Sequence, residues 1–157
     1  MEEWWIGVCN GCHEPSLVRN NGDVIFPEPL PSPTDPLIPE DLAADLDEAK
    51  KCFSTSCYRA CAAMARRVVQ MACICKGAKK ERLVDQVSEL AHAGVITKDI
   101  EEWATVVRWI GNDAAHPGKE SVKEEDAEDC LKLAEQFLHV LFVTPAIAKA
   151  RRAAKGK

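Results

Sequence analysis

The sequence lacks the positive charge of a protein that binds nucleic acid over a broad basic surface. Its 157 residues include 20 Lys and Arg against 25 Asp and Glu, and the formal net charge is −5. A chain with this charge repels a polyanion at long range, so any contact with phosphate must come from a local cluster of basic side chains. Composition alone does not identify a function.

Long apolar runs are also missing. No uninterrupted run approaches the roughly 20 residues that cross a bilayer, and the acidic start Met1-Glu2-Glu3 differs from the basic beginning of a secretory signal. We therefore expect a cytoplasmic protein without membrane contact. Aromatic residues are scarce at 6%, but 46% of the residues are hydrophobic, which is enough for one globular core and too many for a disordered chain.

Cysteine, by contrast, is frequent, with 8 in the chain. Most cysteines lie among Ala, Val and Met in segments that we expect to be helical, where a thiol behaves as a small buried hydrophobic group. We expect these thiols to be reduced, as in the cytosol. The exception is the pair Cys9 and Cys12, which is followed directly by His13.

The chain divides into three segments. Residues 1–26 contain the turn signal Asn20-Asn21-Gly22-Asp23 between two short β-forming runs, which predicts a hairpin. Residues 27–39 contain six prolines and predict an extended linker. Residues 40–157 show helical periodicity and end in a basic tail, which either contacts RNA or is a solubilising terminus.

Apolar spacing predicts several helices in residues 40–157. The expected helices are, in order, one from Glu40, one from a cap at Ser54 or Ser56 to about Lys76, one over about 80–93, one after the cap Thr97, one after a capping box at Ser121–Glu124, and a short basic one from Thr144-Pro145. Short loops join antiparallel neighbours, so the five longer helices predict an all-α fold of the up-and-down bundle type.

The Cys9-x-x-Cys12 pair admits three interpretations. Two thiolates at this spacing, completed by His13 or by a second copy of the chain, form a zinc knuckle. The same spacing occurs in redox pairs, although these normally open a helix that follows a strand. The third interpretation is a remnant of a zinc ribbon that packs the hairpin without metal, since the chain has no second Cys-x-x-Cys. We retain Cys9, Cys12 and His13 as candidate ligands of a structural zinc ion.

A second polar cluster lies in residues 107–118. If a helix continues through this stretch, Arg108, Asn112 and His116 share one face at four-residue spacing. There they can bind a phosphate, with His116 moving a proton near neutral pH and Arg108 stabilising developing charge. Periodicity favours the other interpretation, in which Gly111 ends the helix and Asn112 or Asp113 caps the next segment.

From about residue 39 to residue 145 the sequence resembles the prokaryotic family called domain of unknown function 4145. The most specific part of the resemblance is the pattern Gly111-Asn112-x-Ala114-x-His116. The other matching positions are Glu48-Ala49, Tyr58-Arg59-Ala60, Arg66-Arg67, Leu83 to Val87, Gly94-Val95-Ile96, Val107-Arg108, Pro117 and Glu125-Asp126-Ala127. Upstream, Trp4, the Cys pair and the prolines resemble a zinc-ribbon leader that is frequent in that family.

The family is similar to the higher eukaryote and prokaryote nucleotide-binding (HEPN) superfamily, whose all-α domains usually dimerise and are common in phage-conflict systems. Active members are metal-independent ribonucleases that use an Arg, often a polar residue after it, and a His a few positions on. The resemblance implies Asn112 as the polar residue and His116 as the catalytic residue, with no cofactor required. Gly111 stands where the motif has its Arg, so Arg108, one turn earlier, is the candidate substitute.

Two functions follow as expectations. The first is a HEPN-like RNA- or nucleotide-binding module of a phage-conflict system, a homodimer or the partner of a larger defence protein, that acts as a conditional ribonuclease. Arg66 and Arg67 are its candidate phosphate ligands, unless one is solvated and the stem of the other covers the core. The alternative is a non-catalytic dimerisation or protein-interaction domain in which the Gly-Asn-x-Ala-x-His pattern is structural. A weaker third expectation is a zinc-dependent regulator that uses Cys9 and Cys12.

Overall fold

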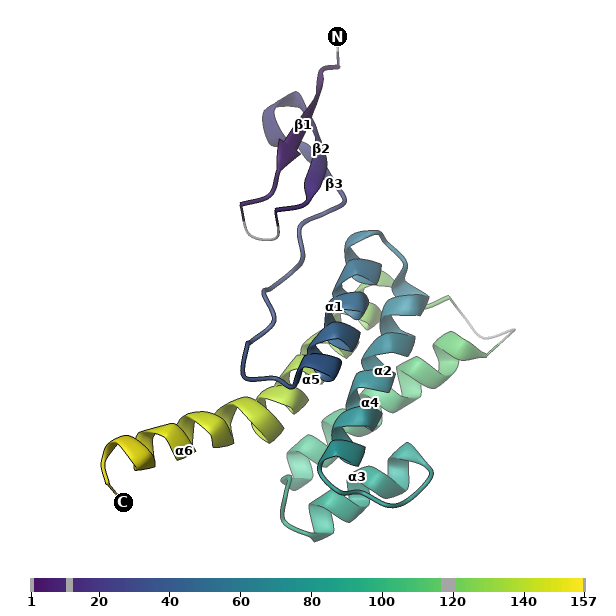
Figure 1. The fold of residues 1–157 in the computed structure, drawn as a ribbon. Coiled ribbons are helices and arrows are strands. Elements are labelled where there is room, and N and C mark those ends of the chain that lie inside the picture. The colour runs from purple at the N-terminus through teal and green to yellow at the C-terminus, as the bar shows by residue number, and fades with distance from the viewer. Residues whose placement is uncertain (1, 11–12, 117–120, 157) are drawn as a thin grey trace.

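The computed structural model describes residues 2–10, 13–116 and 121–156, and it shows a small sheet, a connector and a helical body (Figure 1). The strands are β1 (Trp4–Val8), β2 (Pro15–Arg19) and β3 (Val24–Phe26), with a 3-10 turn, η1, at Asn20–Gly22. The helical elements are α1 (Glu40–Ser54), α2 (Tyr58–Cys75), α3 (Leu83–His92), α4 (Lys98–Ala115), α5 (Glu124–Leu138), the π-turn η2 (His139–Val143) and α6 (Thr144–Ala154). The mostly helical class is confirmed.

The N-terminal sheet contains the predicted hairpin and one strand more. β2 and β3 pair antiparallel, with Leu17 opposite Phe26. Asn20 and Asn21 take positive φ angles of 46° and 58° in the turn, a conformation that Asn tolerates better than most residues. β1, which the sequence did not predict, pairs antiparallel with the other side of β2 and gives the order β1-β2-β3.

The proline-rich connector, residues 27–39, has no helix or strand, as predicted. A buried lysine attaches it to the helices. The ammonium of Lys50 on α1 is fully buried, donates to Ser32 O at 3.0 Å and Thr34 Oγ1 at 2.8 Å, and forms an ion pair with Glu135 of α5 at 2.8 Å. Ser32 Oγ donates to the same Glu135 carboxylate at 2.6 Å. The connector is therefore held against α1 and α5.

In the helical body, α2 lies among α1, α4 and α5, while α3 packs on α2 and α4 (Figure 1). Small residues of α2 that are fully buried, such as Ala62, Ala65 and Ala72, let these neighbours approach. Three predicted helix boundaries are confirmed. α1 begins at Glu40, Thr97 Oγ1 accepts from the Ile100 N–H at the start of α4 (3.5 Å), and Gly94 follows α3 with a φ of 69°.

Other predicted starts are wrong. Ser54 lies inside α1 and Ser56 follows it, so the N-cap of α2 is Cys57. α5 begins two residues later than predicted, because the Asp126 carboxylate accepts from the Lys123 N–H at 3.1 Å and makes Lys123 the N-cap. α3 begins at Leu83 rather than about residue 80, because side chains of α3 hold the preceding loop in a non-helical path.

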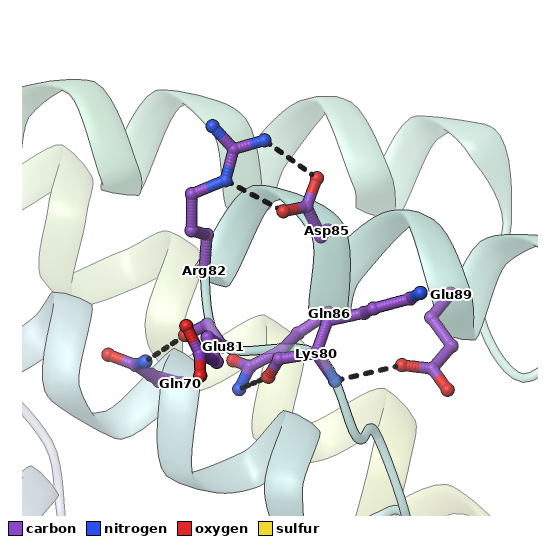
Figure 2. Close-up of polar contacts among 7 residues, drawn as sticks. All are labelled: Gln70, Lys80, Glu81, Arg82, Asp85, Gln86 and Glu89. Atoms are coloured by element: carbon purple, nitrogen blue, oxygen red, sulfur yellow. Dashed lines mark hydrogen bonds and ion pairs between the residues drawn. The ribbon is translucent and has the colours of Figure 1, made fainter.

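Figure 2 shows these loop contacts. Gln86 is buried and donates to Lys80 O at 2.8 Å, while Glu89 accepts from the Lys80 N–H at 3.4 Å. At the first turn of α3, Arg82 donates twice to Asp85, at 2.8 and 3.1 Å, which lowers the pKa of that carboxyl group. Gln70 of α2 reaches Glu81 O at 3.5 Å. These contacts fix the path of the loop that joins α2 to α3.

The predicted short basic helix from Thr144-Pro145 is present as α6, but these two residues do not cap it, because α5, η2 and α6 form one continuous helix, Glu124–Ala154. The π-turn lies directly before Pro145, whose ring has no N–H and clashes with the carbonyl four residues earlier in a regular helix. This helix has the length and apolar composition to cross a membrane, and 39% of its most apolar window is buried inside the molecule. A core helix of a soluble protein meets the same criteria, and the cytoplasmic location stays a prediction.

Candidate functional site

The predicted site residues lie on α4, which is not interrupted at Gly111. The helix continues to Ala115, and His116 is its C-cap, with the His116 N–H donating to Asp113 O at 3.2 Å. The prediction of a helix break at Gly111 is therefore wrong, and so is a new cap at Asn112 or Asp113. The alternative interpretation, a continuous helix, is the one that the structure shows.

Gly111 has a packing role instead of a terminating one. A Cβ atom built on Gly111 would lie 2.6 Å from Arg66 Cβ and 3.0 Å from Ala62 O, both on α2. Cβ atoms do not approach other atoms so closely, so only glycine allows α4 to lie this near α2. The position of Gly111 is thus the point of contact between α2 and α4, and the Arg66 side chain passes over it.

Arg108, Asn112 and His116 follow one another along α4 with a gradual turn away from the core. Because four residues advance a helix by slightly more than one turn, each successive side chain is rotated further outward. Arg108 and Asn112 are half-buried and His116 is exposed. Arg108 and His116 are separated by eight residues, or about 12 Å along the axis. The three form a stripe, and the described contacts include none between their side chains.

Arg108 and Arg66 share an unusual feature. Nε of each guanidinium is buried and has no hydrogen-bond partner among the described residues. A buried donor without a partner costs about 1–3 kcal/mol, more when it is charged. The Arg108 guanidinium carbon lies 5.9 Å from the centre of the Trp109 ring, a cation–π contact that does not satisfy the Nε–H donor. Arg66 approaches Gly111, which lies one turn from Arg108 on α4.

Arg67 lies on another side of α2. It is exposed and binds Asp45 of α1, with Nε 3.0 Å from the carboxylate oxygen. The two candidate phosphate ligands on α2 are therefore separated. The stem of Arg66 covers the α2–α4 contact, and the Arg67 head group is engaged by a carboxylate.

The candidate zinc ligands are only partly described. Cys9 and His13 lie at the turn between β1 and β2, where the His13 N–H donates to Cys9 O at 2.9 Å and the Cys9 N–H donates to Glu14 O at 3.0 Å. Cys12 lies outside the described residues. Across the described ranges, no three His, Cys, Asp or Glu side chains are grouped to hold a metal ion, and the zinc site stays a prediction.

Sequence reasoning missed Lys50. This residue lies beside Ala49 on the inner face of α1, where a cation is unexpected, and its complete burial is the least typical feature of the helical body. Its position among the apolar residues Leu42, Leu46 and Ala49 was the available signal. The unpartnered Arg108 Nε had no sequence signal, because burial of that atom depends on how α4 packs.

The sequence matches the family described as Domain of unknown function (DUF4145) over residues 47–155. The matched region begins within α1 and includes α2, α4 and the whole Arg108–His116 stripe. No curated protein and no solved structure matches the chain significantly.

Proposed function

The chain belongs to the DUF4145 family. From this premise we propose that the protein is a HEPN-like module that binds the phosphates of RNA or of a nucleotide beside the α2–α4 contact. The proposal assigns Arg66 and Arg108 to phosphate binding and His116 to proton transfer. It includes a homodimer and a place in a phage-conflict system, both taken from the resemblance to HEPN domains.

The unpartnered Nε atoms of Arg66 and Arg108 carry this proposal, because these two arginines lie together at the α2–α4 contact, whereas the third arginine with a buried, unpartnered Nε, Arg19, lies in β2. A guanidinium forms its strongest hydrogen bonds with the oxygens of a phosphate or carboxylate, often through two donors at once. Arg66 and Arg108 retain donors that no described residue satisfies. An anion that draws the two guanidinium groups toward solvent would pair these donors and remove the cost of leaving them buried and unpaired. The site is local, which fits a chain with a net charge of −5.

His116 supplies the chemistry of the ribonuclease proposal. It is exposed at the C-terminal end of α4, so its imidazole is accessible to a bound strand. A histidine is neutral or protonated near physiological pH and can take the proton of a ribose 2′-hydroxyl or protonate the departing oxygen. Arg108 would stabilise the charge that develops on the phosphate. No metal ion is required for these steps.

Binding is tested by fluorescence anisotropy with a labelled single-stranded RNA. Arg66→Met and Arg108→Met keep the apolar stem and remove the charge, and we expect each to weaken binding by about tenfold, the effect of roughly 1.4 kcal/mol. Arg67→Met is the matched control and should change affinity less than about twofold, because Asp45 already engages the Arg67 guanidinium. Equal effects of all three substitutions, or of none, would contradict the proposal.

Cleavage is tested on the same RNA in the presence of a metal chelator. The wild-type protein should produce ends that carry a 2′,3′-cyclic phosphate, and His116→Ala should lose this activity while its circular dichroism spectrum is unchanged. Binding without any cleavage by the wild type would remove the ribonuclease and leave the binding module.

An exposed apolar surface favours a second candidate, the dimerisation or protein-interaction domain. Trp103 and Trp109 on the outer side of α4 are 38% and 57% exposed. Large aromatic side chains in such positions are typical of interfaces. Sedimentation analysis should show a dimer that Trp109→Lys dissociates. A monomeric wild type would argue against a homodimer through α4.

A further inference from the structure

The turn between α1 and α2 brings two cysteines together. The Ser56 N–H donates to Phe53 O at 2.9 Å and the Cys57 N–H donates to Cys52 O at 2.8 Å, while Ser56 has a φ of 58°. These two hydrogen bonds and the left-handed residue define a Schellman motif at the end of α1. A side-chain contact between the two residues at the ends of this motif, here Cys52 and Cys57, frequently accompanies it.

The backbone geometry is suitable for a disulfide. With standard bond lengths, the 2.8 Å hydrogen bond from Cys57 N to Cys52 O keeps the two α-carbons within about 7 Å. Peptide bond angles shorten this separation, and disulfides span α-carbon separations of roughly 4.4–6.8 Å. The motif therefore places the two residues at a suitable separation without a movement of either helix.

The two thiols differ in accessibility. Cys57 is exposed, and Cys52 is half-buried. Burial raises the pKa of Cys52, and the Cys57 thiolate and the Glu48 carboxylate raise it further. The next thiol inward, Cys61, is buried, and its pKa is raised to about 12. An oxidant from solvent therefore meets Cys57 first, and Cys52 is the adjacent thiol that can react with it.

We propose that Cys52 and Cys57 are a reversible oxidation site, a thiol pair that closes to an intrachain disulfide across the α1–α2 turn when a hydroperoxide is present. The Cys57 thiolate attacks a peroxide oxygen, the S–O bond of a cysteine sulfenic acid forms as the O–O bond breaks, and the departing alkoxide or hydroxide takes a proton from water. The Cys52 sulfur then attacks the Cys57 sulfur. The S–S bond forms, the S–O bond breaks, and the hydroxide leaves as water with the proton of the Cys52 thiol. A cellular dithiol then reduces the disulfide to the two thiols and is itself oxidised to a disulfide.

The closed form would fix the end of α1 to the N-cap of α2. The connector is attached at the same place, because the Glu28 N–H donates to Ser54 O at 3.3 Å. Oxidation is thus expected to restrict the junction where the N-terminal segment meets the helical body.

The test uses the full chain treated with hydrogen peroxide, blocked with N-ethylmaleimide and digested with trypsin. Lys51 and Arg59 flank the pair, so that both thiols lie in the peptide 52–59. We expect this peptide to lose two hydrogens, to carry no maleimide, and to regain both thiols after treatment with dithiothreitol. Cys57→Ser should abolish the internal bond. Cys75→Ser removes an exposed thiol elsewhere and should leave the bond unchanged.

Three outcomes would overturn the proposal. In the first, peptide 52–59 carries two maleimides, because both thiols stayed reduced, while Cys75 in the same sample is oxidised. Alternatively, Cys52 would be linked to Cys61, or Cys57 would be found only in a bond between two chains.

Discussion

Gly111 illustrates how much a single residue decides in this fold. In a helix interior, glycine costs about 1 kcal/mol relative to alanine, so propensity alone favours replacing it. The structure opposes this replacement, because the α2 backbone and Arg66 Cβ occupy the space of a side chain. Both obstacles are rigid, since neither is the end of a flexible side chain.

Gly111→Ala is therefore expected to lower the free energy of unfolding by about 1–2 kcal/mol, because overpacking typically costs 1–3 kcal/mol and exceeds the gain in propensity. Urea denaturation followed by circular dichroism measures the change. Glu102→Ala, at an exposed position of α4, is the control and should stay within about 0.5 kcal/mol. A more stable Gly111→Ala variant would show that α4 does not approach α2 so closely.

At the scale of elements, the sequence predicted most helices and missed how their ends and partners are arranged. The spacing of apolar residues located α1 to α5, and the asparagines with Gly22 located the hairpin turn. The end of α4 could not be predicted, because a glycine that terminates a helix and a glycine that packs against another helix have the same sequence signal. β1 was missed because its pairing with β2 is a contact between segments.

The same limit applies to the candidate site. The continuous-helix interpretation of residues 107–118 placed Arg108, Asn112 and His116 on one stripe of α4, as the structure does. The sequence did not separate Arg66 from Arg67, because adjacent helical residues point about 100° apart and only packing decides which one faces α4. It also gave no sign that Arg66 would lie against Gly111.

The connector is the element whose attachment is most open to test. Lys50 is fully buried, whereas 28% of the Glu135 side chain is exposed. Glu135→Leu leaves a buried cation with only neutral acceptors, so the free energy of unfolding should fall by about 3 kcal/mol. Lys50→Met leaves a carboxylate that water reaches, and the loss should be smaller, about 1 kcal/mol.

Chemical denaturation of both variants checks this order. If Lys50→Met is the more destabilised variant, the ammonium is not the buried member of the pair.

For the whole molecule, buried thiols make the free energy of unfolding depend on pH in the alkaline range. Burial raises the pKa of Cys61, Cys73 and Cys130 to about 12, from a value of 9.0 for an unperturbed thiol. Between these values the folded state keeps protons that the unfolded state has released. The contribution of these protonated thiols to the free energy of unfolding is therefore fully present below about pH 9 and is lost as the pH rises toward 12.

Each such thiol should lower the free energy of unfolding by about 1.4 kcal/mol per pH unit in this range. We expect Cys73→Ala to reduce the slope of stability against pH by about this amount relative to the wild type, because one titrating group is removed. Urea denaturation between pH 8 and pH 10.5 under reducing conditions measures both slopes. Identical slopes would mean that the Cys73 thiol ionises in the folded state.

The distribution of charge offers two places for an anionic ligand. Residues 139–157 contain five Lys and Arg and no Asp or Glu, so the rest of the chain is more acidic than the whole. α6 has no buried residue and projects from the body (Figure 1). RNA attracted only to this basic end would bind through charge, whereas the proposed site requires Arg66 and Arg108.

The measurement that separates these cases is a nuclear magnetic resonance titration of the arginine Nε–H signals with a short single-stranded RNA. The proposed site predicts that the Arg66 and Arg108 signals shift together and saturate at one affinity, while the Arg67 signal, held by Asp45, does not move. Shifts confined to Arg151 and Arg152, or no shift at all, would contradict phosphate binding beside the α2–α4 contact.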